Sequence, residues 1–350
     1  MTIIVTISAV LILVVLGLLL KIQGMVDVLR GTHHKRETLS NKVNAALFPV
    51  FLIVGTVAFV WFSIYASQFY LPEASSIHGK VTDKMFWESI YVVTFVFIAT
   101  HILLFIFPYI YQFREGHKAT FFPDNNKLEL IWTVIPAIVL ALLVIGGWKE
   151  WSSITGPAPA DHVELEIVGK QFDWMVRYPG ADHKFGKHDF RKIDGTNVLG
   201  LAFTEREGMD DFMADKVYIP KGKAVLFKIR SRDVLHSVFA FHFRQKMDAV
   251  PGMPTQFWFT PTKTTAEMRA ELNDSKFDYA IACAEVCGKS HFAMKQTIIV
   301  LEQSEYDKWY NEQKSFINKN PQYISMVPDN LKAVAMEQIA APAKVASLVP

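Results

Sequence analysis

The first 150 residues carry four long apolar stretches, and polar residues interrupt the chain more regularly after them. The stretches run from Met1 to Leu20, from about Ala46 to Ala66, between Glu88 and Arg114, and from Leu130 to Trp148. Each supplies the roughly 20 apolar residues that cross a bilayer as a helix. Trp and Tyr flank several of them, as is typical of membrane interfaces. We therefore predict four membrane-spanning helices rather than four buried core helices.

The first stretch differs from a cleaved signal peptide. It has no positively charged region before its apolar part and no small-residue cleavage site before Lys21. We expect it to be retained as a helix.

Basic residues in the short connections predict the orientation. Residues 21–45 hold five Lys or Arg, residues 67–89 hold two, and residues 113–128 hold three. Because connections rich in Lys and Arg stay in the cytoplasm, the first and third connections are expected there. An even number of spans then puts the C-terminal part of this multi-pass membrane protein in the periplasm or an equivalent outer compartment.

After Trp151 the pattern changes to short β-type runs separated by turn residues. These runs are "HVELEIVGKQFDWMVRY", "KVYIP", "AVLFKIRS", "FDYAIACAE" and "QTIIVLE". Such spacing predicts an all-β Greek-key sandwich. Residues 179–215 are expected to form a long loop, and the chain from about Glu302 a charged helical segment. The Ala/Pro/Lys-rich tail, residues 328–350, is too poor in large apolar residues to build a core of its own.

Composition excludes several classes of function. The net charge of +2, without a basic aromatic patch, argues against nucleic-acid binding. Two cysteines are too few for a disulfide-stabilised secreted scaffold. The chain has no C-x-x-C-H motif, so it holds no covalently attached c-type haem.

Both cysteines lie in one short segment, "CAEVCGKSHFAM", with a His and a Met close behind them. Two thiolates, an imidazole and a thioether form a soft or borderline ligand set that favours copper over Mg or Ca. Zinc is the main competitor, and Met294 argues for copper because a thioether is a poor zinc ligand. A local disulfide or two reduced buried thiols are the metal-free alternatives. His236, in "SRDVLHSVFAF", is the best upstream candidate for a further ligand.

The segments "DVLHS", "KMDAVPG" and "CAEVCGKSHFAM" together resemble subunit II of haem–copper cytochrome c oxidases. "LELIWTVIPAIVLAL" looks like that family's second transmembrane helix, and "GKQFDWMVRY" like its aromatic segment. The resemblance covers roughly residues 86–315 and implies a cupredoxin fold that holds the binuclear copper centre CuA. It suggests four parts: two extra helices (1–67), a transmembrane hairpin (86–150), a periplasmic CuA domain (151–302) and a C-terminal segment (303–350).

The resemblance also implies a role for each matching residue. Cys283 and Cys287 would bridge two coppers, with His236 and His291 as terminal ligands, Met294 as a weak ligand, and the backbone carbonyl of Glu285 as the last one. One-electron transfer would be the chemistry.

Four acidic residues carry further implied roles. The Glu285 carboxylate would help to bind a Mg or Mn ion at the interface with the catalytic subunit. Asp233 and Asp248 match acidic positions near the copper site or the subunit interface. Glu129 matches the mouth of a proton path, although a lone Glu at a helix start is also a common dipole-compatible residue. No catalytic residue is expected in this chain, since oxygen reduction and proton pumping belong to the partner subunit I.

The sequence departs from the family pattern at the aromatic segment. Phe172 and Asp173 stand where a tryptophan and a tyrosine are usual, followed by Trp174. Electrons are expected to enter at Phe172 or Trp174. The altered segment and the two extra helices suggest a stable donor, such as a membrane-bound or fused c-type cytochrome in a supercomplex with the other oxidase subunits.

Other classes fit less well. A copper storage or delivery module needs an open, exchangeable site and leaves "LELIWT" unexplained. Subunit II of a quinol oxidase shares the fold but lacks the copper ligands, and a simple blue-copper protein has one Cys rather than two.

Overall fold

The computed structural model describes residues 2–31, 39–70 and 72–340. These residues form two compact units. The described parts of Met1–Tyr70 and Trp87–Leu140 make up a helical unit. The described parts of Leu71–Phe86 and Ala141–Pro350 make up a unit built around β-sheets.

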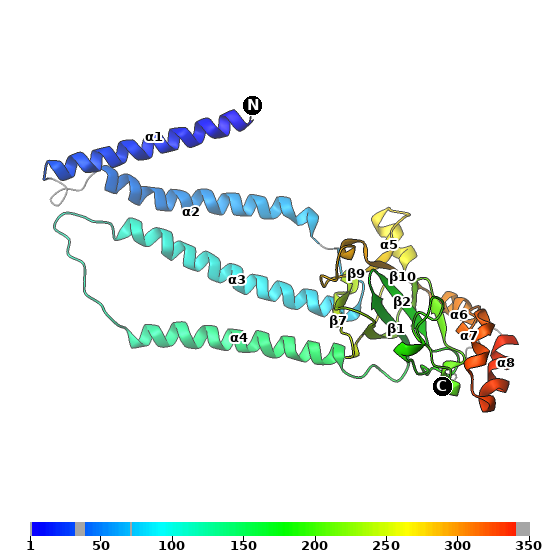
Figure 1. The fold of residues 1–350 in the computed structure, drawn as a ribbon. Coiled ribbons are helices and arrows are strands. Elements are labelled where there is room, and N and C mark those ends of the chain that lie inside the picture. The colour runs from blue at the N-terminus through cyan, green and yellow to red at the C-terminus, as the bar shows by residue number, and fades with distance from the viewer. Residues whose placement is uncertain (1, 32–38, 71, 341–350) are drawn as a thin grey trace. The chain divides into compact units, whose positions relative to one another are not determined.

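The four predicted membrane helices are confirmed as four long apolar helices (Figure 1). They are α1 (Thr2–Leu29), α2 (Leu39–Ala66), α3 (Ile77–Ile110) and α4 (Asn126–Thr155), with a short 3-10 turn at Ser67–Phe69. Each is longer than its apolar stretch, because helical hydrogen bonding continues into the polar flanks. Their most apolar windows bury none of their residues within the chain. These side chains are therefore free to face lipid or other membrane helices.

The expected connection at residues 67–89 is shorter than predicted, because α3 already begins at Ile77. Ser75 N–H donates to the His242 carbonyl over 2.8 Å, and the Ser76 hydroxyl donates to the Phe243 carbonyl over 2.8 Å. Further along, the Arg244 guanidinium pairs with Asp83 at 2.7 Å. These long-range contacts make residues 71–86 part of the β unit, which local sequence patterns could not reveal.

The predicted all-β sandwich is confirmed, with ten strands in two five-stranded sheets. The first sheet has the order β3 (Phe212–Ala214), β2 (Asp173–Tyr178), β1 (His162–Lys170), β5 (Ala224–Ser231), β8 (Thr255–Phe259). The second has the order β4 (Val217–Pro220), β10 (Lys295–Leu301), β9 (Tyr279–Cys283), β6 (His236–Ala240), β7 (Gln245–Ala249). The chain crosses between the sheets, as in Greek-key sandwiches.

The main core lies between the sheets, where apolar side chains from both inner faces are fully buried. Its members include Leu165 and Ile167 of β1, Phe227 of β5, Ile281 of β9 and Ile298 of β10. Four helices complete this unit: α5 (Thr265–Leu272), α6 (Gln303–Asn311), α7 (Phe316–Lys319) and α8 (Lys332–Ala340). The helical segment expected from about residue 302 is thereby confirmed.

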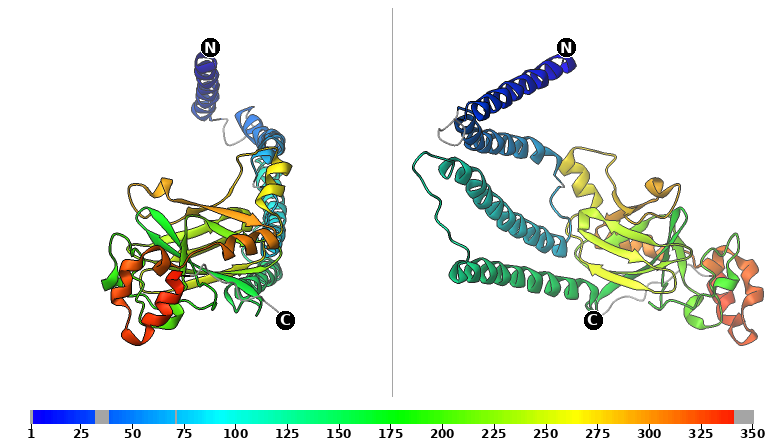
Figure 2. Two further views of the ribbon diagram at one scale, coloured as in Figure 1. Left: turned by 90° about the vertical axis from the view of Figure 1, so that its right-hand side faces the viewer. Right: turned by 60° about the vertical axis from the view of Figure 1, so that its left-hand side comes forward.

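A second core joins the 179–215 segment to the C-terminal helices. Phe203 and Leu201 from that segment pack with Phe316 and Tyr323, and Ala335 of α8 is fully buried among them. Figure 2 shows the red C-terminal helices beside the green segment that includes residues 179–215. The expectation of a plain loop was therefore too simple, and the tail, which was expected to build no core of its own, packs into a core shared with that segment. Residues 212–214 form β3, and residues 329–340 help to build a shared core, while 341–350 lie outside the described residues.

Candidate metal centre

Strand pairing brings the two halves of the predicted copper motif together. Cys283 is the last residue of β9, and His236 is the first residue of β6. The two strands are antiparallel neighbours in register Val238↔Cys283. The chain after β9 then folds back, so that Cys287, His291 and Met294 return to the same end of the sheet before β10 begins.

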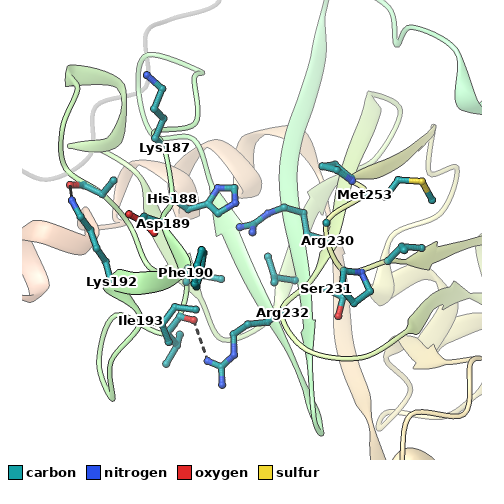
Figure 3. A pocket seen from close by; sticks show the side chains of 18 of the residues that line it. Lys187, His188, Asp189, Phe190, Lys192, Ile193, Arg230, Ser231, Arg232 and Met253 are labelled. Carbon is teal, nitrogen blue, oxygen red and sulfur yellow. Dashed lines mark hydrogen bonds between the residues drawn. The ribbon is translucent and has the colours of Figure 1, made fainter.

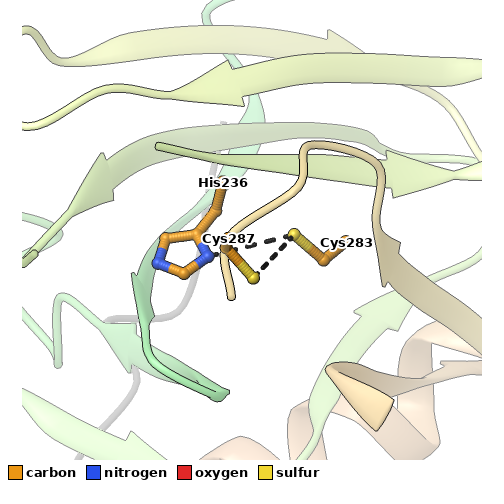
Figure 4. Close-up of side chains that lie close together, drawn as sticks. All are labelled: His236, Cys283 and Cys287. Carbon is orange, nitrogen blue, oxygen red and sulfur yellow. Dashed lines mark hydrogen bonds between the residues drawn. The ribbon is translucent and has the colours of Figure 1, made fainter. Parts of the chain in front are cut away.

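The side-chain donor atoms form a continuous cluster. Cys283 Sγ lies 3.8 Å from Cys287 Sγ and 3.9 Å from His236 Nδ1. Cys287 Sγ lies 3.6 Å from His291 Nδ1 and 3.9 Å from Met294 Sδ. The donor atoms of His236, Cys283 and Cys287 all fall within 4.8 Å of one another (Figure 4). The three side chains His236, Cys283 and Cys287 are thus close enough for their donor atoms to hold one metal centre.

A disulfide does not explain the cysteines. Both are free, and their 3.8 Å sulfur separation is far from the roughly 2 Å of an S–S bond. Cys283 instead directs its S–H to the Glu285 carbonyl over 3.2 Å.

The cluster is buried and has the chemistry of a soft-metal site. His236 is 0% exposed, and Cys287 and Met294 are also buried. Burial, together with the adjacent Cys283 thiol, raises the pKa of Cys287 to about 11. Holding Cys287 as a thiolate therefore requires positive charge beside it, which a thiophilic cation such as copper supplies. The residues present thus fit a copper centre.

Asp233 fixes the orientation of the His236 ring. Its carboxylate lies 2.9 Å from His236 Nε2 and accepts the Gln171 backbone N–H over 2.7 Å. Burial opposes the charge on Asp233, but the hydrogen bonds from Gln171 and His236 outweigh it and lower the pKa of the carboxyl group. Because the ionised Asp233 carboxylate binds Nε2 of His236, the other ring nitrogen, Nδ1, points toward Cys283. This is the arrangement by which carboxylates orient metal-binding histidines.

The aromatic segment contacts both halves of the cluster. Trp174 is 2% exposed and meets the His236 ring edge-on, with ring centroids 5.8 Å apart. Phe172 is half-buried and touches the loop after Cys287: a Cβ on Gly288 would lie 3.0 Å from Phe172 Cε1. The two candidate electron-input residues therefore lie against the centre, one inside and one nearer the surface.

The remaining predicted residues lie outside the donor cluster. The Glu285 side chain is exposed, although its carbonyl belongs to the cluster. Asp248 is exposed on β7, opposite Ser237 of β6. Glu129 lies in the first turn of α4, in the helical unit.

Sequence reasoning overlooked the residues that support the cluster. Gln171 bridges its two halves, because its backbone binds Asp233 and its side-chain amide donates to the Cys287 carbonyl over 2.7 Å. Gly169 leaves room for the His236 ring. Both lie in the "GKQFDWMVRY" segment. Its glycine and glutamine were therefore the signal in the sequence that could have identified these supporting residues.

Comparisons with known proteins agree with this geometry. The chain matches the family models "Cytochrome C oxidase subunit II, transmembrane domain" over residues 64–148 and "Cytochrome C oxidase subunit II, periplasmic domain" over residues 163–303. It is 34% identical over 278 residues to an alternative cytochrome c oxidase subunit 2 of Bradyrhizobium diazoefficiens, covering 77% of this chain and 92% of the relative. It is 25% identical over 260 residues to cytochrome c oxidase subunit 2 of Cereibacter sphaeroides, covering 69% and 78%.

A solved structure of the periplasmic domain of subunit II of a Bradyrhizobium japonicum cytochrome oxidase is also similar. It shares 23% identity and a TM-score of 0.31, covering 44% of this chain and 94% of that one.

The family models and the similar relatives agree with the apolar helices of the chain and with its division into a transmembrane and a periplasmic domain. They imply a CuA centre in the periplasmic domain and a partnership with other oxidase subunits. The chain belongs to the cytochrome c oxidase subunit II family and is the subunit through which electrons enter a haem–copper oxidase.

Proposed function

We propose that six groups of this chain hold the binuclear CuA centre, and that electrons pass from a c-type cytochrome through it to subunit I. The groups are the side chains of His236, Cys283, Cys287, His291 and Met294 and the backbone carbonyl of Glu285. The observation that carries the proposal is the chain of contacts from His236 Nδ1 through both sulfurs to His291 Nδ1, at 3.9, 3.8 and 3.6 Å. When bound, the copper pair supplies one-electron transfer with its charge shared over two metals and two thiolates.

The protein residues contribute by holding the donors still. His236 has no freedom to rotate, since Asp233 binds one ring nitrogen and Trp174 covers the ring. Cys283 N–H donates to the Met294 carbonyl over 3.1 Å, which fixes the two ends of the loop to each other. A donor set that moves little between oxidation states lowers the reorganisation needed for electron transfer, and the buried surroundings exclude water from it.

The ligand assignment is tested on the purified oxidase by spectroscopy. The expected results are a near-infrared absorption band and a copper EPR pattern in which the unpaired electron is shared by two nuclei. Met294→Leu should keep the copper but shift its potential and its EPR parameters. Met209→Leu is the matched control, because Met209 is equally buried but lies in the second core. A copper-replete oxidase without either spectroscopic feature refutes the assignment.

We further propose that electrons enter at Phe172 and continue past Trp174. Phe172 is the more accessible of the two and touches Gly288, next to Cys287. Trp174 is enclosed and touches His236. Phe172→Ala should therefore slow reduction by the donor at least tenfold while leaving the copper spectrum unchanged. An unchanged rate of copper reduction moves the input site elsewhere.

The donor is proposed to be a membrane-bound or fused c-type cytochrome in a stable assembly with the oxidase. Support comes from Phe172 and Asp173 at the usual docking segment and from the extra helices α1 and α2. Turnover of the isolated oxidase with soluble cytochrome c should fall well below turnover of the intact assembly. Equal rates in the two preparations argue against a dedicated donor.

Glu285 is proposed to have two separate functions, its carbonyl toward copper and its exposed carboxylate toward a Mg or Mn ion at the interface with subunit I. Asp248, also exposed, is proposed to lie near the same interface. Glu285→Gln should remove bound Mn from oxidase prepared with Mn, while both coppers remain. Retention of Mn in the variant rejects this role.

Glu129 is proposed as the mouth of a proton path into subunit I. Its side chain is exposed at the start of α4. Glu129→Ala should slow turnover and proton uptake of the assembled complex. Glu115→Ala provides a control with the same loss of charge at another exposed position of the helical unit. Equal proton uptake by the two variants removes Glu129 from the mechanism.

A further inference from the structure

A separate cavity of about 630 Å³ lies on the β unit, apart from the donor cluster. One wall comes from residues 187–204, the opposite wall from the end of β5 at residues 230–232, and the rim from residues 250–254. Figure 3 shows these walls facing each other, with the Arg230 guanidinium and the His188 ring pointing toward one another across the space. Together with Val168 of β1, these segments line the cavity from four parts of the chain.

The wall at residues 187–204 is held in place by hydrogen bonds that need no ligand. Asp189 N–H donates to the Gly200 carbonyl over 2.7 Å, and Ala202 N–H donates to the Lys187 carbonyl over 2.9 Å. The Asn197 side chain closes the turn by accepting the Leu201 N–H over 2.8 Å. A preformed wall of this kind lowers the cost of ordering on binding.

Positive groups dominate the polar lining of the cavity. Lys192 Nζ and Arg232 Nη1 donate to the backbone carbonyls of Ala202 and Val198, over 3.0 and 3.2 Å. Carbonyl partners satisfy these donors but leave the two positive charges without an acidic partner among the described residues. The acidic residue in the lining, Asp189, accepts the Arg191 backbone N–H over 3.0 Å and lies 3.9 Å from the Arg191 guanidinium, which offsets its negative charge. The cavity is therefore electropositive.

Arg230 has one buried guanidinium nitrogen without a hydrogen-bond acceptor in the described part of the chain. Its Nε binds Glu166 over 2.5 Å, but its Nη2 is buried and has no hydrogen-bond partner among the residues that the structure describes. A buried guanidinium nitrogen without an acceptor is costly, since its lost hydration is not replaced. Burial, followed by the charge of Arg230, also lowers the pKa of the facing His188. An oxyanion beside the Arg230 side chain, which is 15% exposed, would offset the positive charge next to both groups.

The rest of the lining is apolar. Val168, Leu199 and Phe190 lie on the inner walls, and Pro251 and Met253 lie at the rim. The cavity is also several times larger than a single oxyanion, and falls in the size range of small-molecule sites. The ligand therefore needs an apolar body as well as a negative head.

We propose that this cavity binds an organic oxyanion, a carboxylate or phosphate carried on an apolar ring or chain, with its head beside the guanidinium groups of Arg230 and Arg232. Both groups line the cavity and supply positive charge and N–H donors. Charge-assisted hydrogen bonds to guanidinium groups are among the strongest that proteins make.

Equilibrium dialysis of the purified full-length oxidase tests this proposal. The probes are phenylacetate and phenyl phosphate, with phenylethanol as the uncharged analogue and inorganic phosphate as the anion without an apolar body. We expect saturable binding of one phenylacetate or phenyl phosphate per chain, at least tenfold tighter than phenylethanol or inorganic phosphate. The tighter of the two aromatic anions identifies the head group. Absence of saturable binding by both, or equal binding by phenylethanol, overturns the proposal.

Variants locate the bound anion. Arg230→Gln should weaken binding at least tenfold, and Arg232→Gln severalfold. Because Arg230 also pairs with Glu166, the exposed Arg232 carries the test if Arg230→Gln fails to fold. Lys276→Gln is the matched control, since it removes one exposed positive charge outside the cavity and should leave binding unchanged. Equal affinity of Arg232→Gln and Lys276→Gln for the probe refutes binding at this site.

Discussion

Gly169→Ala is the sharpest test of how the fold holds the metal centre. Gly169 lies in β1, opposite Trp174 of β2. A Cβ at this position would lie 2.8 Å from His236 Cδ2, 3.1 Å from His236 Cγ and 3.1 Å from Trp174 Cζ3. Ordinary van der Waals contacts begin at about 3.4 Å, so one added methyl group forces the His236 ring to move by roughly half an ångström.

The loss in free energy of unfolding depends on how far the His236 and Trp174 rings can move. His236 is 0% and Trp174 2% exposed, and Asp233 binds the far nitrogen of His236 at 2.9 Å. Overpacking of such a rigid core site costs about 1–3 kcal/mol. Replacing glycine by alanine also lowers the conformational entropy of the unfolded chain, which stabilises the folded state by about 0.4–1 kcal/mol. The net loss is about 1–2 kcal/mol, or a fall in Tm of about 2–8 °C for a domain of this size.

The assay is thermal unfolding of the full-length chain with and without copper, together with copper EPR of the assembled oxidase. Gly195→Ala is the matched control, since a Cβ there has nothing within 4 Å. We expect Gly195→Ala to keep the parent's copper spectrum and to melt at or slightly above the parent's Tm, since only the stabilisation of about 0.4–1 kcal/mol from the lower unfolded-chain entropy applies there. Gly169→Ala should lower the Tm and change the copper spectrum, because His236 is displaced from Cys283. If both variants unfold at the same temperature and give the same spectrum, the packing argument is wrong.

Three further predictions concern the rest of the β unit. Burial lowers the pKa of His242 from 6.5 to about 4, so neutral His242 favours the folded state. Stability is therefore complete above pH 6.5 and falls by about 1–2 kcal/mol as the pH drops toward 4, a loss that His242→Gln should flatten in pH-dependent denaturation. Tyr310→Phe removes a buried hydroxyl that donates to the Gly180 carbonyl over 2.7 Å. It should cost about 1–3 kcal/mol in urea unfolding, more than Tyr306→Phe, and equal losses would contradict this account. Ending the chain after residue 327 removes α8 and uncovers the second core. The truncated chain should bind a hydrophobic dye and melt earlier with an unchanged copper spectrum, whereas a parent-like melting curve would show α8 to be dispensable.

The cysteine segment was informative in the sequence because its chemistry is local. Cys283, Cys287, His291 and Met294 fall within twelve residues, so their spacing alone indicated a soft-metal site. Spacing alone could not link His236 to this segment, since 47 residues separate it from Cys283, although its sequence context and the family resemblance both suggested it as a ligand. Strand pairing between β6 and β9 closes that distance, and no local pattern encodes which strands pair.

The membrane helices and most strands could likewise be read from the sequence, because hydrophobic length and alternation reflect local surroundings. Two of the supporting residues could not be read in this way. Gln171 and Gly169 acquire their functions only through partners that are distant in the sequence.

The sequence by itself determined the four apolar helices, the β-sandwich and the ligand types of the metal centre, since these depend on residues close together in the chain. Only the tertiary structure decided that residues 71–86 join the β unit, that α8 completes a second core, and that Arg230 faces His188 across a cavity. These features depend on burial and on contacts between distant segments. Their free energy is gained only when the whole chain packs, so no single stretch of sequence carries them.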